Sequence, residues 1–545
     1  MMLTGPGMRA GGIMATIKTL PGGAWTNLHG TQTATVTDHR GLCADPGAPA
    51  FARFGAQATA IKGLLADLRA AARPLAVQGS SWSFSRIITP EGAPGTWFET
   101  GEAGDLMVVG SADLAAPPPF PPHLVMASGG AKLIALNAFA EANGMSLRTS
   151  GSYCGQSVAG AIGSGVHGSV MDYGAFQNHV RGLLMVVSPT DAVWIEPGPA
   201  PILSDATVAQ FADRRVNDPE LFGAALVHIG AMGVVAAALL ELAPYYEIEV
   251  FRVMQALDDA AIARLSNGQW RDFVRELGVD RDPLFIEVIL NPFMPTSAIR
   301  SMPGAQAMIT VYFKAAAPHV ETSAKAMLPN QLQGGLDDIL KLIVRGIVNH
   351  PDWLPTWTVA ALAAAEFAKE VTPGGPLPPV SWGTVHGGFT PHSIMGVVPP
   401  LHNDSFAFPR DRLAQALSLA HSAFVASGGG HLVWTLRFVA PSAGTMAFTR
   451  FPETVVINMD GIRSDPTNTA VAAIRQALDD NGVPYAQHWG KMGVMTPALI
   501  EAQFGPSTDP STPLARWRAA RATLVPDPAM RAIFANAAVC AWGLC

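Results

Sequence analysis

TSGSYCGQSVAGAIGSGVHG, residues 149–168, is the stretch from which the fold of this chain can be read. Its glycines leave the backbone open, and Cys154, Ser157, Ser164 and His167 carry its reactive or hydrogen-bonding groups. Glycine lets a ligand approach the main chain where a Cβ atom would block it, at an entropic cost. The segment therefore predicts a planar or phosphorylated ligand pressed against the backbone. A glycine-rich turn without a ligand is the alternative.

A G-x-G-x-x-G pattern lies inside this stretch, at Gly163, Gly165 and Gly168. In a nicotinamide-binding Rossmann domain this pattern follows a strand, opens a helix and precedes an acidic residue that holds a ribose. Here it is followed by SVMDYGAFQNHVRG, which lacks a helical apolar period, and then by the strand-like run LLMVV. The pattern therefore does not indicate a Rossmann domain.

Composition narrows the class of protein. Of the 545 residues, 49% are hydrophobic and 14% are charged, which is typical of a well-buried globular chain with more than one core. The net charge of -7 is spread without a basic stripe, so nucleic acid is not expected as a partner. A small neutral or weakly polar substrate fits better.

Targeting signals and cysteine chemistry give a second set of expectations. No apolar run reaches the roughly 18 residues of a membrane span, and the N-terminus lacks the apolar core of a signal peptide. The four cysteines, Cys43, Cys154, Cys540 and Cys545, are too scattered for a disulfide framework or a zinc site. We therefore expect no metal, a cytoplasmic location, and a mobile end carrying Cys540 and Cys545.

Hydrophobic periodicity predicts an α+β fold with many short strands. The expected helices cover residues 54–72, 133–143, 258–277, 411–427 and a segment closing at Gly482. The expected strands cover residues 75–77, 180–187, 192–196, 285–290, 308–313, 431–439, 446–448 and 454–459. Proline-rich loops are expected at residues 115–123 and 372–383.

A second small-residue turn follows the strand at residues 75–77. It reads Gly79-Ser80-Ser81-Trp82-Ser83, and such a turn can point several backbone N–H groups at an anion. A simple connection between a strand and a loop is the alternative interpretation.

Five segments in a fixed order resemble the FAD-dependent oxidoreductases of the vanillyl-alcohol oxidase (PCMH-type) superfamily, and within it the sugar-1,4-lactone and alditol oxidase group. The matching segments are Trp25-Thr26-Asn27 with Gly30 and Gln32, GSSWSFS at 79–85, GAIGSGVHG at 160–168, GAMGVV at 230–235 and PYAQHWGKM at 484–492. One such match would be weak, but five in order are specific, and they span most of the chain.

The resemblance implies a division of the chain into an N-terminal tail (1–22), a PCMH-type FAD-binding domain of two α/β subdomains (23–246), an α+β substrate domain with an antiparallel sheet (247–483), and a C-terminal segment returning to the active site (484–545). It also implies residues that contact FAD. These are Gly79, Ser80, Ser81, Trp82, Ser83, Gly151, Cys154, Val158, Gly160, Gly163, Ser164, Gly165, His167, Gly168, Gly233, Val234 and Lys491.

The residue expected to attach FAD differs from the one in many relatives. They carry a histidine bonded to the flavin where this chain has Trp82, and an indole cannot make that bond. Cys154 lies six residues before Gly160, where the berberine-bridge branch places a cysteine that attaches to the flavin. Non-covalent FAD is our favoured prediction, and a link through Cys154 is the alternative.

Alcohol oxidation by a flavin requires an acceptor for the hydroxyl proton and positive charge near the ring. The resemblance places Arg437 and Lys491 as the cations. His488 is either a proton acceptor or a structural clamp, Ser157 is expected near the substrate hydroxyl, and His167 is expected to pack beside the cofactor.

Residues expected at the substrate also depart from the polyol-oxidising relatives, which have an acidic residue two positions before the arginine and a histidine on the next strand. This chain has Thr435 and Asn458 at those positions, with Asp460 beyond. Losing a carboxylate and an imidazole removes hydrogen bonds to a run of hydroxyls, so a less hydroxylated substrate is expected.

These observations predict an FAD-dependent oxidoreductase acting on the CH–OH group of a small alcohol, polyol or lactone, with O2 as electron acceptor and H2O2 as product. The alternatives are a flavin dehydrogenase, an oxidase of a bulkier, sterol-like alcohol or an amine, and a flavin-binding protein without catalytic activity.

Overall fold

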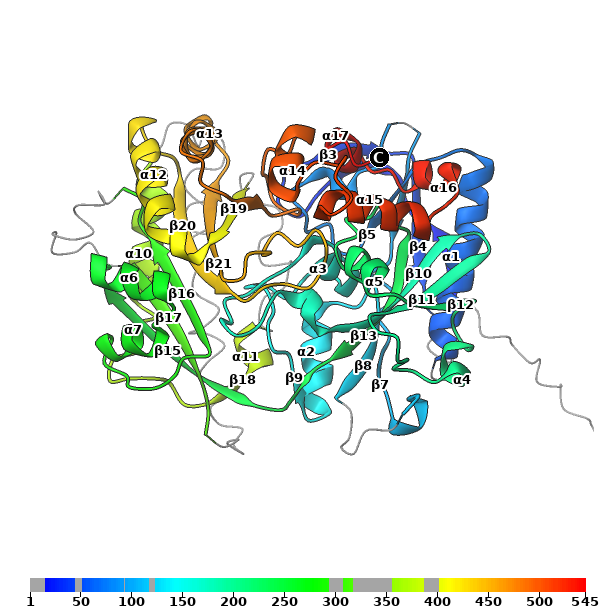
Figure 1. Cartoon of the computed structure of the whole chain (residues 1–545), viewed down its shortest axis with the longest axis horizontal. Helices are drawn as coiled ribbons and strands as arrows, with labels where there is room; N and C mark the ends of the chain where they lie inside the picture. Colours follow the sequence, from blue (N-terminus) through cyan, green and yellow to red (C-terminus); the bar gives the residue numbers. More distant parts are fainter. Residues whose placement is uncertain are drawn as a thin grey trace, which may run out of the picture.

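The computed structural model describes residues 15–44, 51–92, 94–116, 123–293, 307–316, 355–386 and 401–545. Its elements gather around an eight-stranded sheet on one side and two smaller sheets on the other (Figure 1). We call these parts the large-sheet body and the small-sheet body.

The small-sheet body is built on helix α1 (Ala52–Ala70), which packs against both of its main sheets. Ile61, Leu64, Leu65 and Leu68 recur at helical spacing and are buried, as their period predicts. The four-stranded sheet has the order β1 (Thr16–Thr19), β4 (Asp38–Cys43), β6 (Thr96–Glu99), β5 (Leu75–Gln78). The six-stranded sheet has the order β12 (Arg214–Asn217), β11 (Asp191–Glu196), β10 (Val180–Ser188), β13 (Val234–Glu241), β8 (Leu124–Ser128), β7 (Leu106–Val108).

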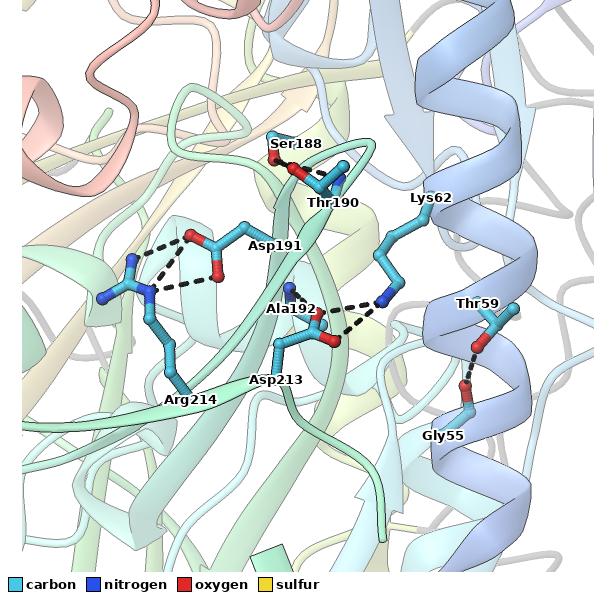
Figure 2. A network of polar contacts seen from close by, with 9 residues as sticks. All are labelled: Gly55, Thr59, Lys62, Ser188, Thr190, Asp191, Ala192, Asp213 and Arg214. Carbon is cyan, nitrogen blue, oxygen red and sulfur yellow. Dashed lines mark hydrogen bonds and ion pairs between the residues drawn. The ribbon is translucent and has the colours of Figure 1, made fainter. Parts of the chain in front are cut away.

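A polar network fastens α1 to the end of the six-stranded sheet (Figure 2). Lys62 Nζ donates to both oxygens of Asp213, at 2.9 and 3.0 Å. Asp213 also accepts from the backbone N–H of Ala192 at 2.7 Å, and Arg214 pairs with Asp191 at 2.9 Å. The network connects the start of β11 to the residues that enter β12, and its role is structural.

The large-sheet body has the order β18 (Val380–Ser381), β15 (Glu247–Gln255), β17 (Ala307–Lys314), β16 (Phe285–Leu290), β20 (Leu432–Val439), β21 (Thr454–Ile462), β19 (Leu401–Pro409), β22 (Ala486–Gln487), and every pairing is antiparallel. Helices α12 (Leu413–Ala426) and α13 (Asp465–Asp480) cover one face, where Trp434, Leu436 and Ile457 are buried. Alternate residues of β20, including Thr435 and Arg437, therefore face the opposite side of the sheet.

The end of the chain returns to the small-sheet body through α14 (Pro497–Phe504), α15 (Pro513–Leu524), α16 (Pro528–Ile533) and α17 (Ala537–Ala541), drawn in orange to red in Figure 1. Trp517 Nε1, Arg521 Nε and Asn536 Nδ2 donate to the backbone oxygens of Val227, Ala231 and Ile229, at 2.9 to 3.0 Å. Together these bonds seat the last helices on the loop that precedes β13.

Two expectations about the chain ends are wrong. Cys540 and Cys545 form a disulfide, and Trp542 beside them packs on Trp489 with ring centroids 5.4 Å apart, so this end is anchored. Residues 16–19, expected in a tail, form β1 and pair with β4. Residues 1–14 and most of the proline-rich connection at 115–123 lie outside the described residues.

Three expected elements differ in extent. The helix expected at 258–277 is two helices, α6 (Asp259–Asn267) and α7 (Trp270–Glu276), because Gly268 adopts a φ of 69° and ends the first one. Residues 446–448 are not a strand, because Met446 lies in a turn and Phe448 in a bend. The loop expected at 372–383 contains β18 and the start of α11 (Trp382–His386). The remaining expected helices and strands are present, with ends shifted by a few residues.

Candidate functional site

Two loops far apart in sequence are hydrogen-bonded to each other at the centre of the molecule. The backbone N–H of Phe84, in the GSSWSFS turn, donates to the oxygen of Gly490 at 2.9 Å. Ser85 Oγ donates to the oxygen of Trp489 at 2.6 Å. The His-Trp-Gly-Lys segment is therefore held against the turn after β5, as a C-terminal segment returning to the site requires.

A cavity with a volume of about 240 Å³ opens beside this junction. Its walls come from the GSSWS turn, the glycine-rich segment, the loop before β13, strands β19 and β21, and the His-Trp-Gly-Lys loop. The predicted site residues in its lining are Gly79, Ser80, Ser81, Trp82, Ser83, Gly151, Ser157, Gly160, Gly163, Ser164, His167, Gly233, Arg437, Asp460, His488 and Lys491.

The GSSWS turn is held in an unusual backbone conformation. Ser81 has a φ of 52°, in the left-handed region that non-glycine residues rarely adopt. Asn27 Nδ2 donates to the oxygen of Ser83 at 2.9 Å, and Leu28 N donates to that of Ser81 at 3.0 Å. Asn27 from the Trp25-Thr26-Asn27 segment thus supports the turn from behind.

The glycine-rich segment forms a short helix, α3 (Val158–Ser164), with Ser157 as its N-cap. Ser157 Oγ accepts from the N–H of Gly160 at 3.3 Å, so this hydroxyl has a structural partner as well as a place in the lining. A Cβ atom on Gly79 would lie 1.8 Å from Ser157 Oγ. The turn and the helix can approach this closely only because residue 79 is glycine.

One end of the cavity is charged. Arg437 Nε donates to Glu287 Oε2 at 2.7 Å, and its Nη2 donates to Ser152 Oγ at 2.6 Å. Burial lowers the pKa of Lys491 to about 8, although Asp460 opposes the shift. Burial raises the pKa of Asp460, against the opposing effect of Lys491 and Arg437. Two cations and a carboxylate therefore share a poorly solvated end of the cavity.

Two histidines of the lining, His167 and His488, have a pKa low enough to keep the imidazole neutral. Burial lowers the pKa of His167 to about 3, with Arg437 as a further cause. Burial and the charge of Lys491 hold the pKa of His488 well below its ordinary value. His488 Nδ1 accepts from the N–H of Gly490 at 3.0 Å, an arrangement that fits a clamp on the His-Trp-Gly-Lys loop.

Other predicted site residues lie behind the cavity wall. Cys154 is buried and accepts from Asn137 Nδ2 at 3.3 Å, and burial raises the pKa of its thiol to about 12. Thr435 donates to Asp460, and Asn458 accepts from Ser405. The predicted residues outside the lining are Cys154, Val158, Gly165, Gly168, Val234, Thr435 and Asn458.

Polar residues in the lining, and one behind it, were not predicted from the sequence. His29 stacks on Phe84 with ring centroids 3.9 Å apart, and its Nε2 is buried without a hydrogen-bond partner among the described residues. Lys132, behind the turn, donates to the oxygen of Gly79 at 2.6 Å. Asn403, on β19, donates to Asp460. Only His29 had a sequence signal, because it lies inside the matched segment from Trp25 to Gln32.

The residues present fit an FAD molecule. The turn at 79–83 together with Gly160, Gly163 and Gly230 brings backbone close to the cavity, where a dinucleotide could approach it. The Nε2 atom of His29 is buried without a hydrogen-bond partner among the described residues, and a ligand could supply that partner. Trp82 packs on Gly155, where a Cβ atom would lie 2.0 Å from its ring. The Trp82 indole thus packs on the backbone of the glycine-rich segment.

No helix within the described ranges is long and apolar enough to cross a bilayer. In the same part of the chain, no group of three or more His, Cys, Asp or Glu side chains is placed to hold a metal ion.

Sequence comparisons find similarity to sugar oxidases over a limited segment. The D-arabinono-1,4-lactone oxidase of Saccharomyces cerevisiae is 31% identical over 125 residues, which is 23% of this chain and 20% of that protein. The alditol oxidase of a Streptomyces species is 32% identical over 124 residues, 23% of this chain and 25% of that protein. The aligned segment thus spans a quarter or less of these relatives, and no family profile matches the chain.

Structural comparisons cover nearly the whole chain. A variant of the cholesterol oxidase from Brevibacterium sterolicum superposes with a TM-score of 0.63 at 13% identity, covering 99% of both chains. A solvent-stable cholesterol oxidase gives a TM-score of 0.65 at 14% identity, covering 97% of this chain and 98% of the other. The chain therefore shares its fold with these cholesterol oxidases, and a segment of it is similar in sequence to the lactone and alditol oxidases.

Proposed function

We propose that this protein is an FAD-dependent oxidoreductase that oxidises a CH–OH group of a small alcohol, polyol or lactone and passes the electrons to O2. The observation that carries the proposal is the single cavity joining the GSSWS turn to Arg437, Asp460 and Lys491. The sugar-oxidase relatives and the oxidase fold support it.

FAD, when bound, supplies the two-electron acceptor. The protein supplies the surroundings: the turn at 79–83 and the glycine wall hold the cofactor, and the eight-stranded sheet closes the cavity from the other side. Arg437 and Lys491 place positive charge where negative charge develops, in a site of low dielectric constant where this charge acts strongly. Asp460 in its ionised form can accept the hydroxyl proton, and burial makes it a stronger base because it raises its pKa.

The cofactor is proposed to be non-covalent. Cys154 is outside the cavity lining, its thiol is held protonated by burial, and Asn137 donates to its sulfur. A thiolate is the reactive form of cysteine, so this environment disfavours a bond to a ligand. The proposed domain limits are those of the sequence analysis, 23–246 for FAD, 247–483 for substrate and 484–545 for the returning segment, with β15 beginning at Glu247.

The test is spectroscopic. Purified protein is scanned for flavin absorbance and then mixed without oxygen with small alcohols, polyols, lactones and sterol-like alcohols. Bleaching by a member of the first three classes, followed by H2O2 release on admitting air, is the expected result. A protein that cannot take up FAD contradicts the proposal, bleaching without H2O2 identifies a dehydrogenase, and bleaching by sterol-like compounds alone identifies an oxidase of bulky alcohols.

A further inference from the structure

Lys132 lies behind the turn at 79–83 and outside the lining of the cavity. Its Nζ donates to the backbone oxygen of Gly79 at 2.6 Å and to Ser80 Oγ at 2.7 Å. The fold leaves room for the ammonium group, because a Cβ atom on Gly101 would lie only 3.2 Å from Nζ. One ammonium group thus holds two successive residues of the turn from outside the cavity.

These two bonds set the direction of the hydrogen-bond donors of Ser80. A trans peptide points its C=O and N–H groups to opposite sides, so the bond from Lys132 to the Gly79 oxygen turns the Ser80 N–H away from the lysine. Among the described residues, this N–H has no acceptor. The Ser80 hydroxyl accepts from Lys132 and therefore keeps its own hydrogen for donation. Because Ser80 lines the cavity, both donors are available to a ligand there.

An anion is the ligand that suits these donors. Ser81, the next residue of the turn, has a φ of 52°, and a left-handed residue in a turn helps to gather successive N–H groups into an anion-binding concavity. Lys132 adds a positive charge directly behind this concavity. Glu99 acts on the lysine through its charge alone, without a hydrogen bond. The attraction of the lysine for an anion is strengthened by the low dielectric constant of a partly buried site.

We infer that Lys132 is a positioning residue for the diphosphate of the cofactor: it holds the turn so that the N–H and O–H groups of Ser80 face the phosphate oxygens, and its charge stabilises theirs. This inference rests on the proposed function and adds to it a residue outside the cavity lining. Both bonds of the lysine side chain go to oxygens of the turn, so the lysine acts through Gly79 and Ser80.

The test compares flavins that differ in their phosphate groups. Riboflavin has none, FMN has a single phosphate, and FAD has a diphosphate joined to adenosine. Flavin-free wild type, Lys132→Met and Lys62→Met are titrated with each flavin at about pH 7, and flavin fluorescence gives the dissociation constants. Lys62→Met is the matched control, because Lys62 is also bonded within the fold, to Asp213, but lies away from the cavity.

Lys132→Met should weaken the binding of FAD and of FMN by about 10- to 100-fold, as the loss of a charge-assisted hydrogen bond implies. The binding of riboflavin should not change. Lys62→Met should leave all the dissociation constants unchanged. A lysine that served the fold alone would affect all the flavins equally, because they share the same ring and ribityl chain.

Equal weakening of all the flavins in Lys132→Met, or no weakening of any, overturns the inference while leaving FAD binding standing. Weakening of FAD alone also overturns it, because the lysine would then act on the adenosine end. A wild-type protein that binds none of the flavins removes the proposed function itself. Should Lys132→Met not fold, the pH dependence of flavin binding by the wild-type protein decides the question.

Burial lowers the pKa of Lys132 to about 8, and the charge of Glu99 opposes the shift. The other charged side chains on the adjoining elements are His39, which is bonded to Glu99, and Glu102, which forms an exposed ion pair. The ammonium form is lost above this pKa, so the ratio of FAD to riboflavin affinity should fall between about pH 7 and about pH 9. Lys491 titrates in the same range, but it lies where both flavins would place the same ring, so the ratio cancels its effect. A constant ratio overturns the inference.

Discussion

Glu287 and Arg437 stand opposite each other on β16 and β20, and their side chains form an ion pair of 2.7 Å. The side chains are only 16% and 14% exposed, and the guanidinium also donates to Ser152 of the small-sheet body. The arginine is therefore held at the junction of the two bodies, with its charge directed along the cavity wall.

Replacing Glu287 by Gln should destabilise the protein and slow the reduction of bound flavin by substrate. Removing one partner leaves a buried charge without compensation, which costs about 3 kcal/mol of unfolding free energy. Chemical denaturation and anaerobic bleaching measure the two effects. Glu220→Gln, which breaks the exposed pair with Arg516, should cost less than about 1 kcal/mol and leave bleaching unchanged. An equal loss of unfolding free energy in the two variants would contradict the stabilising role assigned to the buried pair.

The rate of bleaching should fall as the pH rises through about 8, the pKa that burial gives Lys491. The ammonium form is present below this pH and is lost above it, and with it the positive charge at the site. Lys491→Ala should bleach about 10²- to 10³-fold more slowly and lack this pH dependence, with flavin retained. Stopped-flow measurements of the bleaching rate would check this pH dependence. They would run from about pH 6 to about pH 10, which is about two pH units on either side of the Lys491 pKa. A decline that persists in Lys491→Ala assigns the titration to another group.

Gly79→Ala should abolish or strongly weaken flavin binding. Its Cβ atom would lie 1.8 Å from Ser157 Oγ, so the turn after β5 would have to move away from α3. Gly63→Ala is the control, because a Cβ there meets no atom within 4 Å and the exchange within α1 should stabilise the helix by about 0.5–1 kcal/mol. Flavin fluorescence titration of both variants gives the comparison. Full affinity in Gly79→Ala would mean that the close approach of the turn and α3 is not needed for binding.

Asp404→Asn should stabilise the protein at neutral pH. Asp404 is buried on β19, and burial raises its pKa from 3.8 to about 6. The folded state thus binds this proton more tightly than the unfolded state, and stability declines as the pH rises from about 4 to about 6. Asparagine removes the charge and keeps an acceptor for Ser405 N, so a gain of about 2–3 kcal/mol is expected above pH 6 and little below pH 4. Melting curves recorded above pH 6 and below pH 4 would show whether the gain in stability is confined to the higher pH.

Acid precipitation should release all flavin from the wild-type protein and equally from Cys154→Ala. The thiol is buried outside the cavity lining and held protonated, so no bond to the cofactor is expected. The absorbance of pellet and supernatant records the outcome. A yellow wild-type pellet that turns colourless in Cys154→Ala would instead establish the cysteine link.

Much of the fold was predictable because its signals are local. The period of Ile61, Leu64, Leu65 and Leu68 identified α1, and the apolar runs identified β10, β11, β16, β17, β20 and β21. Predictions failed where a single residue or a distant contact decided the outcome. Gly268 divided one expected helix, and packing of Trp542 on Trp489 anchored an end that looked mobile.

The sequence by itself predicted that two glycine- and serine-rich segments and a late His-Trp-Gly-Lys segment share one site, because their residue types and their order resemble those of the lactone and alditol oxidases, and all three line one cavity. Only the tertiary structure decided which side chains face the cavity. Cys154 lies behind its wall, while Asn403 and His29 line it and Glu287 pairs with Arg437. These placements depend on strand register and on contacts between residues far apart in the chain, which no local pattern specifies.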